Sequence, residues 1–495
     1  MKRIQLLAPI ALVLFTMFSP DLSAQDSRGT EFFVGFMRNI NTPGNLVLFL
    51  TGATATTGTV EIPGLAFSAP FTITPGTITS VPIPSTARHS GSNTTENKGI
   101  RVSALAPIAL YGLNQASNTT DAYLGLPRTL LGTDHIVLGY NGGAGGPSEF
   151  QIIGTVDGTQ VIITPSVAGT GRAAGVPYVI ILNRLQSYQL EATGATTDLS
   201  GTLISSTQPL ALFGGAVCTN IPDNGTLACD HVVEQIPATG AWGQNFLTAS
   251  LATRTAGDIF RVIARDNGTQ VTLDGVLVAT LNKGQIYQTS LASNTRHTIV
   301  ASAPVLVAQY CKGQTADNVL SDPFMMLIQP TEQFQTSYTL TTPAATPVAF
   351  TNFINVVAQA GTASQCRIDG NPFSAAFNSI SGTTYVAALQ SVTLGTHNLT
   401  CPDPFAAYSY GYASADSYGY PGGLGLRFIA APRCDVNNDG IISLADINLI
   451  FAARNQPASG PEDQRDFDGD LTITVADARA CQQRCTNAGC AAGGL

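Results

Sequence analysis

Hydrophobic and polar positions alternate in short runs along most of the chain. Between Ile259 and Leu281, the stretch "IFRVIARDNGTQVTLDGVLVATL" places residues such as Val, Ile and Thr around the turn pairs Asn-Gly and Asp-Gly. Alternation with a period of two, interrupted by short glycine turns, is typical of β-hairpins. No segment before residue 440 shows a convincing helical period. The pattern therefore predicts a mainly β protein.

A unit of about one hundred residues recurs along this β region. Its clearest marks are "IRVSALAPIALYG" around Pro107, "LISSTQPLALFGG" around Pro209, "TIVASAPVLVAQY" around Pro304 and "NLTCPDPFAAYSYG" around Pro404. These prolines lie 102, 95 and 100 residues apart. The repeat predicts several copies of one β-module.

The repeat length favours tandem β-sandwich-like modules over the alternative, a β-propeller, because a propeller blade usually takes only about 40 to 50 residues. The repeated β region is expected to cover residues 25–430. Its approximate modules are 28–120, 121–229, 230–321 and 322–430.

Four phrases in this region resemble one known family. They are "GTEFFVGFMRN" from Gly29, "CDHVVEQIPATGAWGQNF" from Cys229, "DIFRVIARDNGTQVTLDG" from Asp258 and "PVLVAQY" from Pro304. The combination is similar to the N-terminal domain of IgGFc-binding proteins, over about residues 29–430. The resemblance implies an extracellular binding or adhesion module, and it brings no catalytic residues with it.

Beyond residue 430 the pattern changes, and "DVNNDGIISLAD" spaces oxygen donors as a 12-residue calcium loop does. Calcium takes six to eight oxygen ligands, and such a loop supplies them from its positions 1, 3, 5, 7, 9 and 12. The expected ligands are Asp435, Asn437, Asp439, the Ile441 carbonyl, Ser443 and Asp446. Gly440 permits the sharp turn.

A second copy, "DFDGDLTITVAD", begins 31 residues later. It offers Asp466, Asp468, Asp470, the Thr472 carbonyl, Thr474 and Asp477. Leu471 stands where the first copy has its glycine, and Gly469 comes two positions earlier, so the second loop is expected to bind more weakly. Because duplication makes a chance match improbable, we predict two Ca²⁺ sites.

A helical stretch is expected after each loop, since apolar residues then recur on one face. In the first stretch they are Leu444, Ile447, Ile450 and Phe451, and in the second Val475, Ala478 and Cys481. Two such loop-helix units, over residues 434–485, resemble a type I dockerin. That resemblance implies docking onto a cohesin-like partner.

This chain departs from the dockerin pattern at the tenth and eleventh loop positions. Dockerins that bind classical cohesins often carry Ser-Thr there, whereas this chain has Leu444-Ala445 and Val475-Ala476. The departure leaves two kinds of partner for an apolar docking surface: another protein, or the β-modules of this chain.

The N-terminus predicts export. A basic start, an apolar run from Ile4 to Phe18 and the small residues Ser23 and Ala24 indicate a signal peptide over residues 1–24. The run is shorter than a membrane-spanning helix needs, and no later segment is apolar enough, so no membrane span is expected in the mature chain. With 11% charged residues and a net charge of -9, no nucleic-acid partner is expected either.

Nine cysteines in an exported chain favour disulfide bonds over catalytic thiols. The candidate pairs close in sequence are Cys218 with Cys229 and Cys366 with Cys401. Cys434 is expected to bond to a cysteine of the tail, for which Cys481 is a candidate. Cys311 is then the odd residue, and residues 486–495 form a Gly/Ala-rich tail.

The five histidines suggest no enzyme, because neither a G-x-S-x-G nor an H-E-x-x-H motif accompanies them. Trp242 and the tyrosines between Tyr408 and Tyr420 are candidates for stacking on a sugar. We therefore predict a secreted, non-enzymatic adhesion protein with an extracellular protein or glycan ligand and a calcium-stabilised coupling module. The alternative is an accessory component of extracellular polysaccharide breakdown.

Overall fold

A computed structural model of the chain describes residues 27–40, 44–143, 145–194, 196–343, 348–425, 434–437, 441–458, 463–467, 472–485 and 490. The expected signal peptide lies outside these residues. The described part is mainly β, with two short helices near its C-terminal end, as the hydrophobic pattern predicts. No helix within it is long and apolar enough to cross a membrane.

Four sheets of seven or eight strands follow one another along the chain, and each defines a module. The first module contains β1 (Gly29–Val34), β2 (Asn45–Thr51), β3 (Thr56–Ile62), β4 (Phe67–Ile73), β5 (Thr79–Ile83), β7 (Ile100–Ala116) and β8 (Thr119–Gly125). The second contains β6 (Thr94–Glu96), β9 (Gly132–Ile136), β10 (Ser148–Gly154), β11 (Thr159–Thr164), β12 (Tyr178–Leu182), β13 (Ser187–Glu191), β14 (Leu203–Thr219) and β15 (Asp230–Ile236).

The third module contains β16 (Gly243–Leu247), β17 (Asp258–Ala264), β18 (Thr269–Leu273), β19 (Val276–Leu281), β20 (Ile286–Leu291), β21 (Thr298–Tyr310) and β22 (Met325–Ile328). The fourth contains β23 (Gln335–Thr342), β24 (Thr351–Gln359), β25 (Arg367–Ile368), β26 (Asn371–Pro372), β27 (Asn378–Ser379), β28 (Tyr385–Val392), β29 (Gly395–Ala413) and β30 (Asp416–Pro421). The helices α1 (Leu444–Ala452) and α2 (Val475–Gln482) follow.

One long strand organises each module. These strands are β7, β14, β21 and β29. Along its first half each pairs with an outer hairpin, such as β3–β4, and along its second half with an inner strand, such as β2, which is paired in turn with a strand that follows the hairpin. The strand therefore belongs to both layers, whose apolar faces enclose a core between them. This arrangement is the curled, sandwich-like module that the repeat predicts.

The four prolines of the repeat mark the point where each long strand leaves one layer for the other. In the first module, the partner strand β1 pairs with Ser103 and then with Ile108, so that the four residues ending in Pro107 are skipped. The same four-residue shift ends at Pro209, Pro304 and Pro404 in the other modules. Proline has no backbone N–H to give to the ladder, which suits it to this break.

Each of the first three modules ends with a strand that the expected boundaries assigned wholly or mostly to the next repeat. β8, β15 and β22 pair with the long strands that precede them, β7, β14 and β21. The sheets therefore divide the chain one strand later than the sequence boundaries at 121, 230 and 322.

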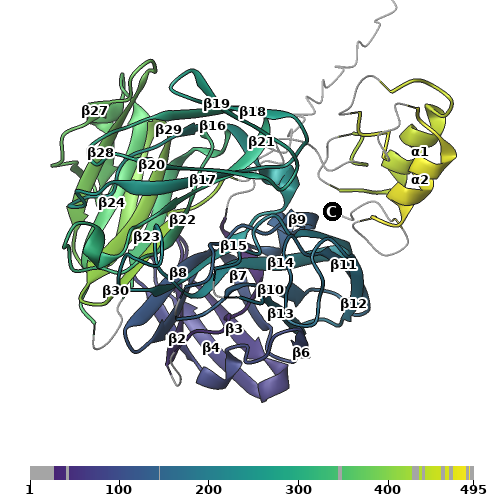
Figure 1. Ribbon diagram of the computed structural model, residues 1–495, viewed down its shortest axis with the longest axis horizontal. Helices are drawn as coiled ribbons and strands as arrows, with labels where there is room; N and C mark the ends of the chain where they lie inside the picture. Colours follow the sequence, from purple (N-terminus) through teal and green to yellow (C-terminus); the bar gives the residue numbers. More distant parts are fainter. Residues whose placement is uncertain are drawn as a thin grey trace, which may run out of the picture.

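These last strands also join the modules. β8 contacts β15 and β30, and β22 contacts the same two strands, so the four form a closed ring, which we call the central ring (Figure 1). The modules are thus not a simple string of separate sandwiches. Ring closure is a feature of the propeller alternative, although each module is far larger than a propeller blade.

Asp121 of β8 lies inside this ring and touches all three other modules. Its carboxylate accepts the backbone N–H groups of Val233 at 3.0 Å, Met325 at 3.2 Å and Gly419 at 3.4 Å. Strands β15, β22 and β30 are thereby held to β8 by one side chain. Buried N–H groups need acceptors, and here a carboxylate supplies them where no neighbouring strand does.

Candidate metal-binding module

The C-terminal helices and the segments before them form the candidate metal-binding module, drawn in yellow beside β9, β11 and β12 (Figure 1). Nine of the twelve predicted calcium ligands fall on described residues. Asp439, Asp468 and Asp470 lie outside them. The two helices begin at Leu444 and Val475, the tenth position of each predicted 12-residue loop.

The ninth residue of each loop caps the helix that follows. The Ser443 hydroxyl accepts the N–H of Ala445 at 3.2 Å, and the Thr474 hydroxyl accepts the N–H of Ala476 at 3.1 Å. Both are capping boxes, with Asp446 or Asp477 as the third helical residue. The sequence analysis assigned Ser443 and Thr474 only as calcium ligands. The spacings Ser-x-x-Asp and Thr-x-x-Asp would also have indicated their role as helix caps.

The twelfth residue of each loop folds back onto the start of its own loop. In the first copy, Asp446 accepts the N–H of Ser443 at 2.9 Å and that of Asn437 at 3.1 Å. In the second copy, Asp477 accepts the N–H of Thr474 and that of Phe467, both at 2.7 Å. Each closing carboxylate therefore bridges the two ends of a predicted loop.

Burial concentrates negative charge in this small module. Asp435, Asp446, Asp466 and Asp477 are each no more than 2% exposed. Carboxylates removed from water need opposite charge or several donors. Within the described residues, no three Asp, Glu, His or Cys side chains stand where they would share one metal ion.

The two loop-helix copies are tied together by backbone pairing. The N–H of Asn455, after α1, donates to the carbonyl of Ile473 at 2.7 Å, and the N–H of Ile473 donates to the carbonyl of Gln456 at 3.0 Å. Thr472 lies in the same bridge, opposite Pro457. The predicted ligands Ile441 and Thr472 thus precede the helices at matching places in the two copies.

The predicted apolar stripes are only partly buried. Ile447, Ile450, Ala478 and Cys481 enter the small core between the helices. The other members of the stripes remain exposed. Leu444 is 53% exposed, Phe451 46% and Val475 38%, because each lies at a helix end where the partner helix does not cover it.

Four disulfide bonds occur among the described residues. Cys218 bonds to Cys229, Cys366 to Cys401 and Cys434 to Cys481, which are the pairs that the sequence suggests. A further bond joins Cys485 to Cys490. Cys311 is a buried free thiol.

His231 has structural partners in the core. His231 is fully buried, and its ring nitrogens lie 2.9 Å from the Ala216 carbonyl and 3.1 Å from the Asn114 amide. Burial, followed by the positive charge of Arg88, lowers the pKa of His231 to about 3. His231 is therefore neutral at ordinary pH and well suited to a core.

Two other histidines repeat one contact. His297 lies 2.6 Å from Asp274, and His397 lies 2.7 Å from Asp369, through Nδ1 in both cases. Each aspartate precedes the glycine of a turn, in "LDG" ending at Gly275 and in "IDG" ending at Gly370, and these two motifs occupy similar places in the third and fourth modules. The shared phase of these motifs could have predicted the pairing.

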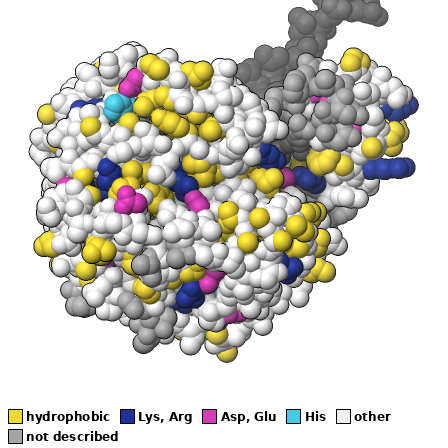
Figure 2. Space-filling model, in the orientation of Figure 1, with side chains coloured by type: hydrophobic (Ala, Val, Ile, Leu, Met, Phe, Trp, Pro, Cys, Tyr) yellow, Lys and Arg dark blue, Asp and Glu magenta, His cyan; other side chains and the backbone are white. Residues whose placement is uncertain are grey.

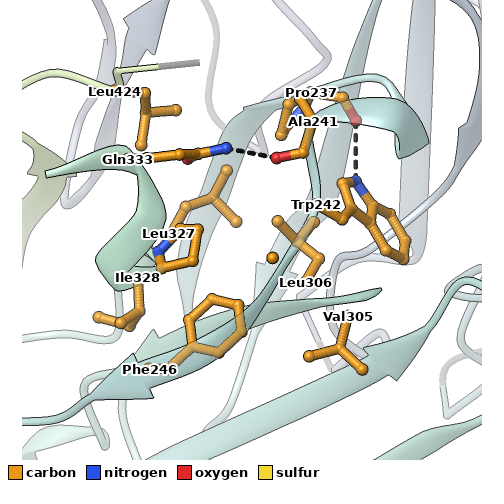
Figure 3. Close-up of a pocket in the computed structure, with 12 residues that line it drawn as sticks. Pro237, Ala241, Trp242, Phe246, Val305, Leu306, Leu327, Ile328, Gln333 and Leu424 are labelled. Atoms are coloured by element: carbon orange, nitrogen blue, oxygen red, sulfur yellow. Dashed lines mark hydrogen bonds between the residues drawn. The ribbon is translucent and has the colours of Figure 1, made fainter. Parts of the chain in front are cut away.

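The aromatic residues considered for sugar stacking are in the core. Trp242 is 1% exposed, and its indole N–H donates to the Pro237 carbonyl at 3.1 Å (Figure 3). The cavity beside it has a volume of only about 10 Å³, roughly what one water molecule occupies. The tyrosines from Tyr408 to Tyr420 are buried as well. These side chains offer no open face to a glycan.

Exposed apolar side chains instead gather on two outer hairpins. Ile162, Val176, Val179 and Ile181 lie on and beside β11–β12, where they are 47% to 62% exposed. Val276 and Leu277, at the start of β19 in the third module, are 64% and 55% exposed. Figure 2 shows yellow side chains over both regions, with Lys, Arg, Asp and Glu side chains scattered across the rest of this face.

Comparison with known proteins places the β region in a family. The family described as IgGFc binding protein matches residues 121–411. The human IgGFc-binding protein is 25% identical over 441 residues, which cover 84% of this chain. The chain spans about 8% of the length of that relative. More than half of the chain is thus matched by one family, and the chain belongs to the IgGFc-binding protein family.

Proposed function

We propose that this protein is a secreted, non-enzymatic binding protein that joins two partners. The ring of β-modules holds an extracellular protein ligand, and the C-terminal loop-helix module, folded around two Ca²⁺ ions, couples the ring to a second protein. Family membership and the name of the human relative support the binding role. The disulfide bonds fit an oxidising, extracellular compartment.

The position of the two closing carboxylates carries the calcium part of the proposal. Asp446 and Asp477 each reach back to the beginning of a loop that offers further oxygen donors, as the last ligand of a 12-residue calcium loop does. Bound Ca²⁺ would neutralise the buried charges of Asp435 and Asp466 beside them. A core as small as this one gains much of its folding free energy from metal.

The exposed apolar ends of the two helices form the proposed coupling face. Leu444 and Val475 occupy the same position in the two copies, and both are exposed. The contact between this module and the ring is made elsewhere by a charged group, since Arg484 lies 2.7 Å from Asp134 of β9. The apolar face is therefore free to bind another protein. Its Leu-Ala and Val-Ala pairs favour a partner unlike a classical cohesin.

The outer hairpin of the second module is the proposed ligand face. Val179 and Ile181 point outward from β12, which is the edge strand of its sheet. Exposed apolar patches on secreted domains usually mark protein contacts. An edge strand also offers unpaired backbone groups to an incoming chain.

Capture from the organism's extracellular material tests the two faces separately. Val179→Lys with Ile181→Lys is expected to abolish capture of the ring ligand, and Leu444→Lys with Val475→Lys to abolish capture of the tail partner. Only the second interaction should require calcium. The matched surface control is Gln270→Lys, an exposed position on β18 in the third module, because Gln160 lies directly opposite Ile181 on the proposed ligand face. Unchanged capture by both double variants would refute the proposal.

A further inference from the structure

Arg484 joins the C-terminal module to the second β-module. Its guanidinium lies 2.7 Å from a carboxylate oxygen of Asp134 and 3.4 Å from the Thr133 hydroxyl, both on β9. Asp134 and Arg484 are 350 positions apart in the sequence. Figure 1 shows the two helices beside β9, on the side of the ring where β11 and β12 lie. The module therefore docks on one particular sheet of the ring.

Asp134 lies in the same row of the same sheet as the proposed ligand face. It stands opposite Ser205 of β14, and Ser205 stands opposite Ile162 of β11. Ile162 in turn stands opposite Val179 of β12. Paired residues of antiparallel strands project to one side, and strands are about 5 Å apart, so Ile162 is about 10 Å from Asp134. A helix with its side chains is about 10 to 12 Å wide, and the docked module therefore borders the ligand face.

The second predicted calcium loop positions the side chain of Arg484. The guanidinium lies over the ring of Phe467, 4.5 Å from its centroid, and a cation is attracted to the face of an aromatic ring. Phe467 is the second residue of that loop, and its N–H donates to Asp477, the closing carboxylate, at 2.7 Å. The N–H of Arg484 donates to the Cys481 carbonyl of α2 at 3.0 Å. The first loop has Val436 at the position of Phe467, without an aromatic ring.

The contact between Arg484 and Asp134 is suited to open and close. The two side chains are 23% and 49% exposed, and ion pairs that water reaches are weak and screened by salt. Only residues 426–433 separate Gly425 of the ring from Cys434 of the module in the sequence. Because the two partners stay tethered, an opened contact re-forms easily. A change in how Arg484 is held is therefore enough to shift the balance.

We propose that Arg484 is a latch between the C-terminal module and β9, and that the second loop closes this latch when it holds Ca²⁺. The inference rests on the calcium sites of the proposed function. A filled second loop fixes Asp477 and Phe467, and with them the guanidinium that reaches Asp134. A stable protein interface covers about 800 Å² on each partner. A protein that covers Ile162 must therefore contact or displace the closed module, so the latch regulates the ligand face.

The distance between two spin labels tests the latch in the full-length chain. The labels are attached at Gln160→Cys on β11 and at Asn448→Cys on α1, both exposed positions, while the free thiol Cys311 is buried. With calcium, pulsed electron paramagnetic resonance should give one narrow distance peak. Arg484→Ala should cause the loss of this peak, and so should Asp134→Arg. The charge exchange Asp134→Arg with Arg484→Asp should restore it, because the ion pair re-forms with its signs reversed.

Loop variants, with bound calcium counted by calorimetric titration in parallel, separate the latch from the calcium sites. Asp466→Ala, which removes the first ligand of the second loop, should abolish the narrow peak, whereas the matched change Asp435→Ala in the first loop should keep it. Phe467→Leu leaves every predicted ligand in place and should abolish the peak without loss of calcium.

The inference is overturned, and the proposed function survives, if the chain binds calcium but Arg484→Ala keeps the narrow peak. The same holds if Asp466→Ala and Asp435→Ala behave alike, or if Phe467→Leu keeps the peak. A wild-type chain that binds no calcium would instead contradict the proposed calcium sites, and the control of the latch with them.

Discussion

The carboxylate of Asp121 accepts the backbone N–H of Met325 at 3.2 Å, although the two residues are 204 positions apart. They belong to the first and third modules, which lie on opposite sides of the central ring. Contacts of this kind make the four modules one body, and a binding protein gains a rigid frame from them. The stability of the ring should therefore depend on a few buried acids.

Asp121→Ala tests that dependence. The substitution leaves the buried N–H groups of Val233 and Met325 without their acceptor, and each such loss costs about 1 to 3 kcal/mol. We expect the free energy of unfolding to fall by about 3 kcal/mol or more in chemical denaturation. Asp121→Asn keeps one acceptor oxygen and should be milder. A change below about 0.5 kcal/mol for the Ala variant, the range of ordinary surface substitutions, would contradict this account.

The closing carboxylates of the two loops should act independently. Asp446→Asn is expected to remove one Ca²⁺ from the C-terminal module and Asp477→Asn the other, because each side chain closes only its own loop. Calorimetric titration of the full chain measures the loss. Asp463→Asn is a suitable control, since Asp463 is buried in the same module but pairs with Arg465 at 2.7 Å. Two retained loop sites in either closing variant would argue against the assignment.

The disulfide between Cys218 and Cys229 should stabilise the second module. It closes a short loop, with a sequence separation of 11, and removing such a bond costs about 2 to 4 kcal/mol. Cys218→Ser with Cys229→Ser is expected to lower the melting temperature of the β region. Cys485→Ser with Cys490→Ser should not, since that bond lies in the tail. Peptide mapping that finds Cys218 and Cys229 free in the native protein would rule the bond out.

His231 predicts a pH dependence of stability. Burial lowers its pKa to about 3 in the folded chain, against about 6.5 for an ordinary histidine in the unfolded chain. Between these values the unfolded state binds more protons, so this residue's contribution to stability is lost as the pH falls. His231→Asn should make the slope of unfolding free energy against pH shallower, by up to about 1.4 kcal/mol per pH unit.

The control for His231 is His297→Asn, which removes an imidazole from the surface contact with Asp274. Unfolding free energies are compared between about pH 7 and about pH 4, because this range begins above the pKa of an ordinary histidine and ends well below it. The same slope in wild type and in the His231 variant would show that the buried imidazole makes no such contribution.

Local sequence features predicted the module well. Alternating hydrophobic and polar positions, Gly turns and the spacing of Pro107, Pro209 and Pro304 indicated repeated sandwich-like units. These features could be read from the sequence because strands and turns depend on residues that are close together in the chain. The central ring was not predicted, because it depends on contacts such as that of Asp121 with Met325, which no local pattern encodes. For the same reason the last strands of the first three modules, β8, β15 and β22, were assigned wholly or mostly to the following repeat.

In the C-terminal module, too, local features were predictable and features that depend on packing were not. The sequence predicted a helical stretch in each copy, and helices do begin at Leu444 and Val475. The capping signals at Ser443 and Thr474 were also present in the sequence. The exposure of Leu444 and Phe451 was not predictable from helical periodicity, since it depends on where the second helix ends against the first. An apolar stripe shows which face of a helix is hydrophobic, but not how much of that face a neighbour covers.

The most direct test of the calcium-folded coupling module is hydrogen–deuterium exchange of the full-length protein with calcium and with chelator. We predict that calcium strongly slows exchange of the amides in α1 and α2, as metal binding and folding are linked there. Amides in the outer hairpins, such as β11 and β12, serve as the internal reference and should exchange alike in both conditions. Equal exchange of α1 and α2 with and without calcium would contradict the account.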